Sequence, residues 1–332
     1  MDSTRYAYSV GRVRAIESKM LDRSGFEKMI EARTVEDAVK VLMDAGYEDE
    51  ISGFAEYAFE KILQKEKRKL YGLLYEISPE PEMYQLFLIK NDYHNLKVLL
   101  KAEFSGQEAD SFLLDTGLIP ADKIKVMVRE RNFGQMHDIM KNAINEALEI
   151  FNHTQDPQLS DIILDNARFR HMKSFAEKLD NRFVDGLIEL LIDSVNIKTF
   201  IRCKKLGKSR DFIKRVIIPY GSIDQNKYLS AIDASVEELS TRFGNTRYGK
   251  VVEKGIAGFA STGKMSYIEK AFDEYTVEYV NKAKYVAIGP EPMIRYIFIK
   301  EYEIMNAGII LAGKSNNISN DVIRERLREY YA

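Results

Sequence analysis

One stretch near the C-terminus has the spacing of a phosphate-binding loop. Residues 308–315 read Gly-Ile-Ile-Leu-Ala-Gly-Lys-Ser, a full match to G-x-x-x-x-G-K-[ST]. In such a loop the backbone N–H groups surround phosphates, the lysine reaches the β- and γ-phosphates, and the loop follows a strand. Here the intervening Ile, Ile, Leu and Ala continue the apolar face of a helix. We therefore predict that Lys314 belongs to a helix and that the chain does not bind nucleotide directly.

The sharpest local charge lies between residues 202 and 215. Seven basic residues stand there against one acidic residue, Asp211, in a chain whose net charge is -2. Such a cluster fits an acidic partner protein, lipid headgroups or RNA. It also fits a basic helix end that complements the helix dipole, followed by a solvated turn. The candidate partner-binding residues are Arg202, Lys204, Lys205, Lys208 and Arg210.

An acidic residue followed three positions later by an asparagine occurs three times. The pairs are Asp92/Asn95, Asp193/Asn196 and Glu303/Asn306. Two interpretations stay open: the three pairs line a shared cavity around a pseudo-three-fold axis, or each makes structural hydrogen bonds at the edge of its own core. No base or nucleophile accompanies the carboxylates, so we predict no catalytic residues and no enzyme activity.

Histidine and cysteine offer no support for metal or disulfide chemistry. The single cysteine, Cys203, excludes an intramolecular disulfide, and we expect it to be a buried small residue in a reducing compartment. The four histidines are scattered and form no metal-ligand pair. They are His94, His137, His153 and His171. We therefore predict no metal site and no cofactor.

The acid–asparagine pairs belong to a longer internal repeat. Apolar residues follow each asparagine at one, four and five positions, and the Pro-Glu-Pro sequences beginning at Pro79 and Pro290 stand at the same distance before Asn95 and Asn306. This pattern predicts one long helix per unit with its apolar residues buried. Eleven positions after each asparagine stands a residue that readily takes the left-handed conformation at a helix end. These residues are Gly106, Gly207 and Asn317.

The composition and the repeat together predict the organisation of the chain. Its 332 residues contain only 7 prolines and 19 glycines, which favours an all-α fold. We expect three similar helical units, and no apolar run approaches the roughly 20 residues of a membrane-spanning helix. The expected parts are an N-terminal segment, 1–18, three helical repeats, 19–116, 117–220 and 221–315, and a C-terminal helix, 316–332.

Four segments in order resemble one family, the C subunits of archaeal and bacterial A/V-type ATPases, whose eukaryotic counterpart is the d subunit of the V-ATPase. The first segment, 6–15, reads Tyr-Ala-Tyr-Ser-Val-Gly-Arg-Val-Arg-Ala, and the second, 90–102, contains the first acid–asparagine pair. The turn at 219–224 and the segment Ile-Arg-Glu-Arg-Leu at 323–327 are similar to that family as well. Family members often have Asn-Ala where this chain has Val-Gly before its second arginine.

The resemblance implies a non-catalytic rotor subunit. Its three helical units would form a funnel around a pseudo-three-fold axis, coupling proton or sodium transport to ATP synthesis or hydrolysis. The implied partners are central stalk subunits of the D and F type and the membrane rotor ring, and nucleic acid is not among them. The resemblance also implies a peripheral membrane protein on the cytoplasmic side of the cell membrane. The alternatives are a helical-repeat scaffold, or an RNA-binding protein that uses the basic segment 202–215.

Overall fold

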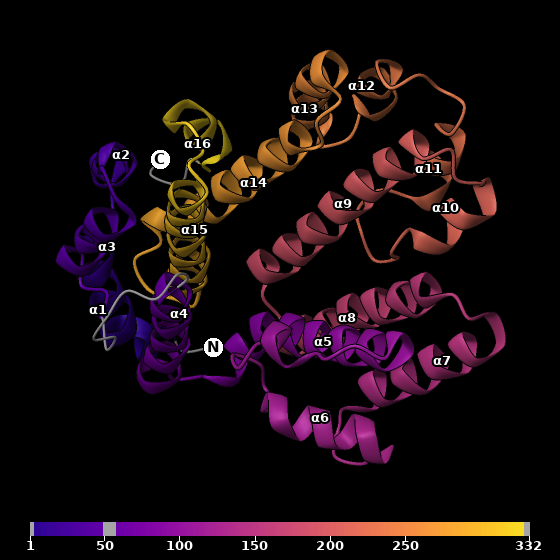
Figure 1. Ribbon diagram of the computed structural model, residues 1–332, viewed down its shortest axis with the longest axis horizontal. Coiled ribbons are helices and arrows are strands. Elements are labelled where there is room, and N and C mark those ends of the chain that lie inside the picture. Colours follow the sequence, from indigo (N-terminus) through magenta and orange to yellow (C-terminus); the bar gives the residue numbers. More distant parts are fainter. Residues whose placement is uncertain (1–2, 49–57, 329–332) are drawn as a thin grey trace. The chain divides into compact units, whose positions relative to one another are not determined.

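Every regular element in the described part of the chain is a helix. The computed structural model describes residues 3–48 and 58–328 (Figure 1), and it confirms the all-α class within those ranges. Three short stretches lie outside the described residues: 1–2, 49–57 and 329–332. They belong to the expected N-terminal segment, first repeat and C-terminal helix.

The chain divides into two compact units. One takes Met1–Pro81 together with Ala257–Ala332, and the other takes Glu82–Ile256. Compactness and sequence repetition divide a chain by different criteria, so the three expected repeats remain a prediction about the sequence. The two chain termini therefore belong to the same unit.

The unit that holds both termini is built around one long helix. That helix is α15 (Glu291–Ser315), and it packs against helices from both ends of the chain. Its neighbours before residue 82 are α1 (Ala7–Glu17), α2 (Arg23–Glu31), α3 (Val35–Asp44) and α4 (Ala58–Ile77). Those after residue 256 are α14 (Ser266–Asn281), η3 (Lys282–Tyr285) and α16 (Asn320–Arg326). A short η1 (Ser3–Tyr6) precedes α1.

The second unit contains the other two helices that carry the repeat. They are α5 (Glu82–Ser105) and α9 (Arg182–Lys205), and both pack against α8 (Pro157–Leu179), which also lies beside α7 (Asp138–Thr154) (Figure 1). Shorter helices complete the unit: η2 (Asp110–Phe112), α6 (Ala121–Glu130), α10 (Arg210–Val216), α11 (Gln225–Ser230) and α12 (Glu238–Phe243). Helix α13 (Gly249–Thr262) contains the boundary between the units.

Helices α5, α9 and α15 confirm the periodicity seen in the sequence. The expectation of one long helix per unit was wrong, because α4 has 20 residues and α8 has 23, and they lie in the same expected repeats as α5 and α9. In α5, the apolar residues after Asn95 are buried, and so are their counterparts in α9 and α15. The residues expected to end these helices all have left-handed backbones, with φ of 67° at Gly106, 61° at Gly207 and 54° at Asn317. Glycine and asparagine take this conformation at little cost, so the three copies share one way of ending the helix.

Candidate functional site

The basic segment spans the end of one helix and the beginning of the next. Arg202, Lys204 and Lys205 lie in the last turn of α9, Lys208 lies in the connecting turn, and Arg210 is the first residue of α10. Cations in the last turn of α9 lie where the helix dipole is negative, which favours them there. The segment therefore has a structural reason for part of its charge.

Two of the five candidate residues bind backbone carbonyls of the protein itself, although Lys204 is only half-buried and Arg210 is exposed. The Lys204 ammonium donates to the backbone carbonyl of Ala234 at 2.6 Å and also to that of Ile232. Arg210 Nη1 donates to the Leu229 carbonyl at 3.1 Å. These carbonyls lie at and just beyond the C-terminal end of α11, where helical carbonyls lack intrahelical partners. Lys204 and Arg210 therefore hold α11 in place, a role that the sequence pattern does not reveal.

The other three candidates differ in exposure, and Lys208 is half-buried. Arg202 and Lys205 are exposed, and the Lys208 ammonium lies 4.9 Å from the centre of the Phe212 ring. Beside them Leu206, the residue that follows α9, keeps 69% of its surface exposed. The structure thus brings Arg202, Lys205 and Leu206 together at one helix end. Their binding of a partner remains a prediction.

Each repeated asparagine joins its long helix to a later segment. In every copy the side-chain amide donates to the carbonyl of one residue and accepts from the N–H of the same residue. The pairs, each with its two distances, are Asn95 with Leu114 (2.7 and 2.8 Å), Asn196 with Ile218 (both 2.8 Å) and Asn306 with Arg328 (2.8 and 2.9 Å). A buried amide that satisfies both hydrogen-bonding atoms of a loop residue fixes the path of that loop.

The acidic residues of the repeat have backbone partners as well. Asp92 accepts from the Ile119 N–H at 3.1 Å. Asp193 accepts from the N–H and the hydroxyl of Ser222 at 2.8 and 2.6 Å, and from the Tyr248 hydroxyl at 2.9 Å. Asp92 is 1% exposed and Asp193 is fully buried. Their hydrogen-bonding supports the structural interpretation of these pairs rather than a shared polar cavity.

In the third copy the acidic residue reaches back to the beginning of the chain. Glu303 accepts from the Leu21 N–H at 2.8 Å and from the Tyr47 hydroxyl at 2.7 Å. It also pairs with Lys300, whose ammonium lies 2.8 Å from Glu66. Glu303 is fully buried. These contacts attach three residues from the first part of the chain to α15, which lies near the other end of the chain.

Asp92 is a buried carboxylate with an unusual proton affinity. Burial raises the pKa of Asp92 to about 7, although the N–H groups of residues 118 and 119 favour the charged form. The backbone of Gly117 packs directly on the Asp92 carboxylate, so a β-carbon on Gly117 would overlap Asp92 Oδ1. In the same way, a β-carbon on Gly221 would overlap Asp193 Oδ1. Both glycines therefore let the backbone approach a buried carboxylate, a role that sequence reasoning missed.

The segment that resembles a phosphate-binding loop is helical, as predicted. Residues 308–315 form the last two turns of α15. The Lys314 ammonium donates to the Ala32 carbonyl, just past the end of α2, at 2.5 Å. A β-carbon on Gly313 would lie 2.7 Å from the Ile323 side chain, so this glycine allows α16 to pack closely. Both residues thus have packing roles.

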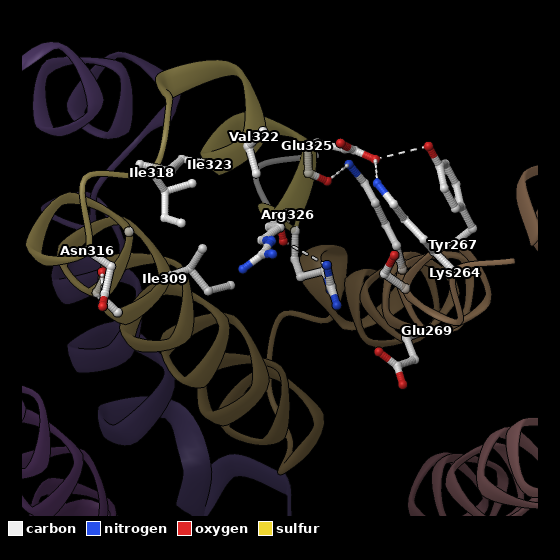
Figure 2. A pocket seen from close by; sticks show the side chains of 15 residues that line it. Lys264, Tyr267, Glu269, Ile309, Asn316, Ile318, Val322, Ile323, Glu325 and Arg326 are labelled. Atoms are coloured by element: carbon white, nitrogen blue, oxygen red, sulfur yellow. Dashed lines mark hydrogen bonds and ion pairs between the residues drawn. The ribbon is translucent and has the colours of Figure 1, made fainter. Parts of the chain in front are cut away.

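A groove of about 850 Å³ lies between α14 and α16, over the C-terminal part of α15 (Figure 2). Ile309, Ile318 and Val322 give it an apolar lining. At its rim the Tyr267 hydroxyl donates to Glu325 at 2.9 Å, and the Lys264 ammonium lies 4.0 Å from the same carboxylate. The lining residues contain no histidine or cysteine. Sequence reasoning missed this groove because its walls come from separate helices.

The described histidines and acids do not assemble a metal centre. No group of three or more His, Cys, Asp or Glu side chains in residues 3–48 and 58–328 is placed to hold a metal ion. His171 is buried, its ring stacks on that of His137 with 4.1 Å between centres, and burial lowers its pKa to about 4. Cys203 is buried, as the sequence predicted, and burial raises the pKa of its thiol.

Comparison with known proteins settles the family. A model of the ATP synthase (C/AC39) subunit family matches residues 9–326. The chain belongs to the ATP synthase (C/AC39) subunit family. The resemblance seen in four short segments is therefore confirmed over nearly the whole chain.

Relatives in this family match nearly the whole length of the chain. The C subunit of the V-type sodium ATPase of Enterococcus hirae is 26% identical over 319 residues, which cover 96% of this chain and 97% of that protein. The C subunit of the A-type ATP synthase of Thermococcus kodakarensis is 25% identical, covering 98% of this chain and 91% of that protein. The corresponding protein of Methanocaldococcus jannaschii is also 25% identical, with 98% and 87% covered.

One property of the helices bears on the membrane. Within the described ranges, none of the helices combines the length and the apolar character that crossing a bilayer requires.

Proposed function

We propose that this chain is the C subunit of an A/V-type ATP synthase or ATPase, a non-catalytic rotor part that couples the central stalk to the membrane rotor ring. The observation that carries the proposal is the family match over residues 9–326. Relatives of nearly the same length are named as the C subunits of a V-type sodium ATPase and of A-type ATP synthases. A coupling part needs shape and contacts rather than a reactive group.

The repeated anchors support a three-part architecture for this subunit. In each copy a buried acid and a buried asparagine on a long helix hold backbone groups of another segment. Three copies of one device suit three similar units, and we propose that these surround a pseudo-three-fold axis as a funnel. A rotor part of this shape receives the foot of the stalk at one end and sits on the ring at the other.

The partners of the proposal are the D- and F-type stalk subunits and the ring subunit, at the cytoplasmic surface of the membrane. Arg202 and Lys205, which are exposed residues of the basic segment, are candidate contacts at that membrane surface. Lys204 and Arg210 also support the fold, because their donor groups bind carbonyls at the end of α11. The transported ion is a proton or sodium, and the name of the Enterococcus hirae relative indicates sodium for that protein.

Purification from native membranes tests this proposal. A tagged chain should bring down stalk and ring subunits, and the recovered complex should hydrolyse ATP. The Lys314→Ala variant should recover the same subunits and the same activity per complex, because Lys314 donates to a backbone carbonyl rather than to a nucleotide. A chain that purifies alone, or that hydrolyses ATP by itself in a Lys314-dependent way, would contradict the proposal.

A further inference from the structure

The three repeats provide an internal standard for the charge that the fold itself requires. Residues 202–215 carry seven basic residues against one acidic residue, a net charge of +6. The stretch 101–114 of the first copy has one basic and three acidic residues, a net charge of -2. The stretch 312–325 of the third copy has two of each, a net charge of 0. Ending the long helix therefore does not require a basic segment.

The backbone at the end of the long helix is shared by the three copies, whereas the surface residues differ. All three copies have a left-handed residue after the helix, at Gly106, Gly207 and Asn317. The residue immediately before it is Leu206 in the middle copy, but serine in the first and asparagine in the third. An exposed leucine is thus an addition of the middle copy, as the positive charge is.

The added groups lie on two helices, α9 and α10, that contact each other. Arg202 and Leu206 are four residues apart and Lys205 stands between them, so the three side chains project from the same helix end. On α10, Lys214 and Arg215 are exposed while Ile213 and Val216 turn into the core. We call this set the α9–α10 basic surface, and its members are Arg202, Lys205, Leu206, Lys214 and Arg215.

We propose that the α9–α10 basic surface binds anionic lipid headgroups, with Leu206 entering the interfacial layer. Each cation near an anionic leaflet adds to the electrostatic attraction to that leaflet. An apolar side chain between the cations adds binding free energy when it enters the boundary between headgroups and acyl chains. An acidic protein would have to supply a pocket that fits Leu206, whereas a bilayer accepts a projecting leucine anywhere. This inference goes beyond the coupling role and does not depend on it.

Vesicle flotation with the purified full chain tests the inference. We expect binding to vesicles that contain about one third phosphatidylglycerol, little binding to phosphatidylcholine alone, and release by salt. The double change Arg202→Glu and Lys205→Glu should weaken binding at least roughly tenfold, because two attractive charges become repulsive. Leu206→Ser should weaken binding about fivefold without changing the net charge.

A matched control separates a local surface from net charge. Lys123→Glu with Arg129→Glu makes the same charge change on exposed residues of α6 and should change binding less than about twofold if the α9–α10 basic surface is the contact. Circular dichroism melts establish that each variant is folded. Absent vesicle binding, or equal losses in the two double variants, would overturn the inference. Salt-sensitive loss of a protein subunit from the purified complex, with no vesicle binding, would overturn it in favour of an acidic protein.

Discussion

The Glu303 carboxylate accepts a hydrogen bond from the Leu21 N–H across 282 residues of chain, at 2.8 Å. The Tyr47 hydroxyl donates to the same carboxylate. Asp193 has a similar pair of partners, the N–H of Ser222 and the hydroxyl of Tyr248, but both follow it in the chain. The third copy of the repeat is therefore completed by residues from the beginning of the chain.

Removing the Glu303 carboxylate should destabilise the unit that holds both termini. We expect Glu303→Ala to lower the free energy of unfolding by about 3–5 kcal/mol, because it leaves the buried Lys300 with one fewer anion and two donors without an acceptor. Urea denaturation measures the change. Met305→Ala, at a partly exposed position of the same helix, is the control and should cost less than about 1 kcal/mol. Equal losses for the two variants would contradict the anchoring role.

Gly117 should tolerate a methyl group only when Asp92 is absent. The β-carbon of Gly117→Ala would overlap Asp92 Oδ1, so we expect a loss of about 2 kcal/mol or more in the free energy of unfolding. In the Asp92→Ala background the same change should cost less than about 1 kcal/mol, a non-additivity that a double-mutant cycle measures. Gly72→Ala, which meets open space in α4, should be neutral or stabilising. Additive losses would show that the carboxylate is not the obstacle.

The buried Asp92 should make stability depend on pH between about 4 and 7. Its folded pKa is about 7, against 3.8 for an ordinary aspartate, so the folded chain binds the proton more tightly than the unfolded chain does. The contribution of Asp92 to the free energy of unfolding is fully present below pH 3.8 and is lost as the pH rises through 7. Each unit by which the folded and unfolded pKa values differ corresponds to about 1.4 kcal/mol.

The Asp92→Asn variant isolates this effect from the other titrating groups. We expect the wild type to lose stability relative to the variant as the pH rises from 5 to about 7. Above that pH the difference in unfolding free energy should stay constant. Urea denaturation across that range measures it. A difference that is independent of pH would contradict the raised pKa.

Neighbouring lysines of the basic segment should behave differently. Lys204→Ala should lower the free energy of unfolding by about 2–3 kcal/mol, because backbone carbonyls after α11 lose a charged donor. Lys205→Ala, at an exposed position, should cost less than about 0.5 kcal/mol. Thermal or urea unfolding compares them. Equal stabilities would show that the inward contacts of Lys204 contribute nothing.

Periodicity in the sequence was sufficient to predict the three helices that carry the repeat, although it missed α4 and α8, which are also long. The apolar spacing after Asn95, Asn196 and Asn306 depends only on local helix geometry, and the residues that end the helices are of types that adopt a left-handed backbone. The same local reasoning correctly treated the segment around Lys314 as part of a helix. Interactions between neighbours in the chain are therefore readable from the sequence.

The partners of the repeated polar residues could not be predicted, because they are backbone groups of distant segments. Nothing in residue type pairs Glu303 with the Leu21 N–H, and a charge count does not distinguish Lys204, which turns inward, from Lys205, which stays exposed. The groove beside Tyr267 depends on how three helices pack. These features follow from tertiary packing.

We propose that this chain couples ATP chemistry to ion movement, and the ratio of ions transported to ATP hydrolysed measures that coupling most directly. Membrane vesicles that carry the complex should lose ATP-driven ion transport when this chain is depleted, and adding back the purified chain should restore the ratio. ATP hydrolysis by the catalytic subunits should persist without it. Transport that continues unchanged after verified depletion would contradict a coupling role for this chain.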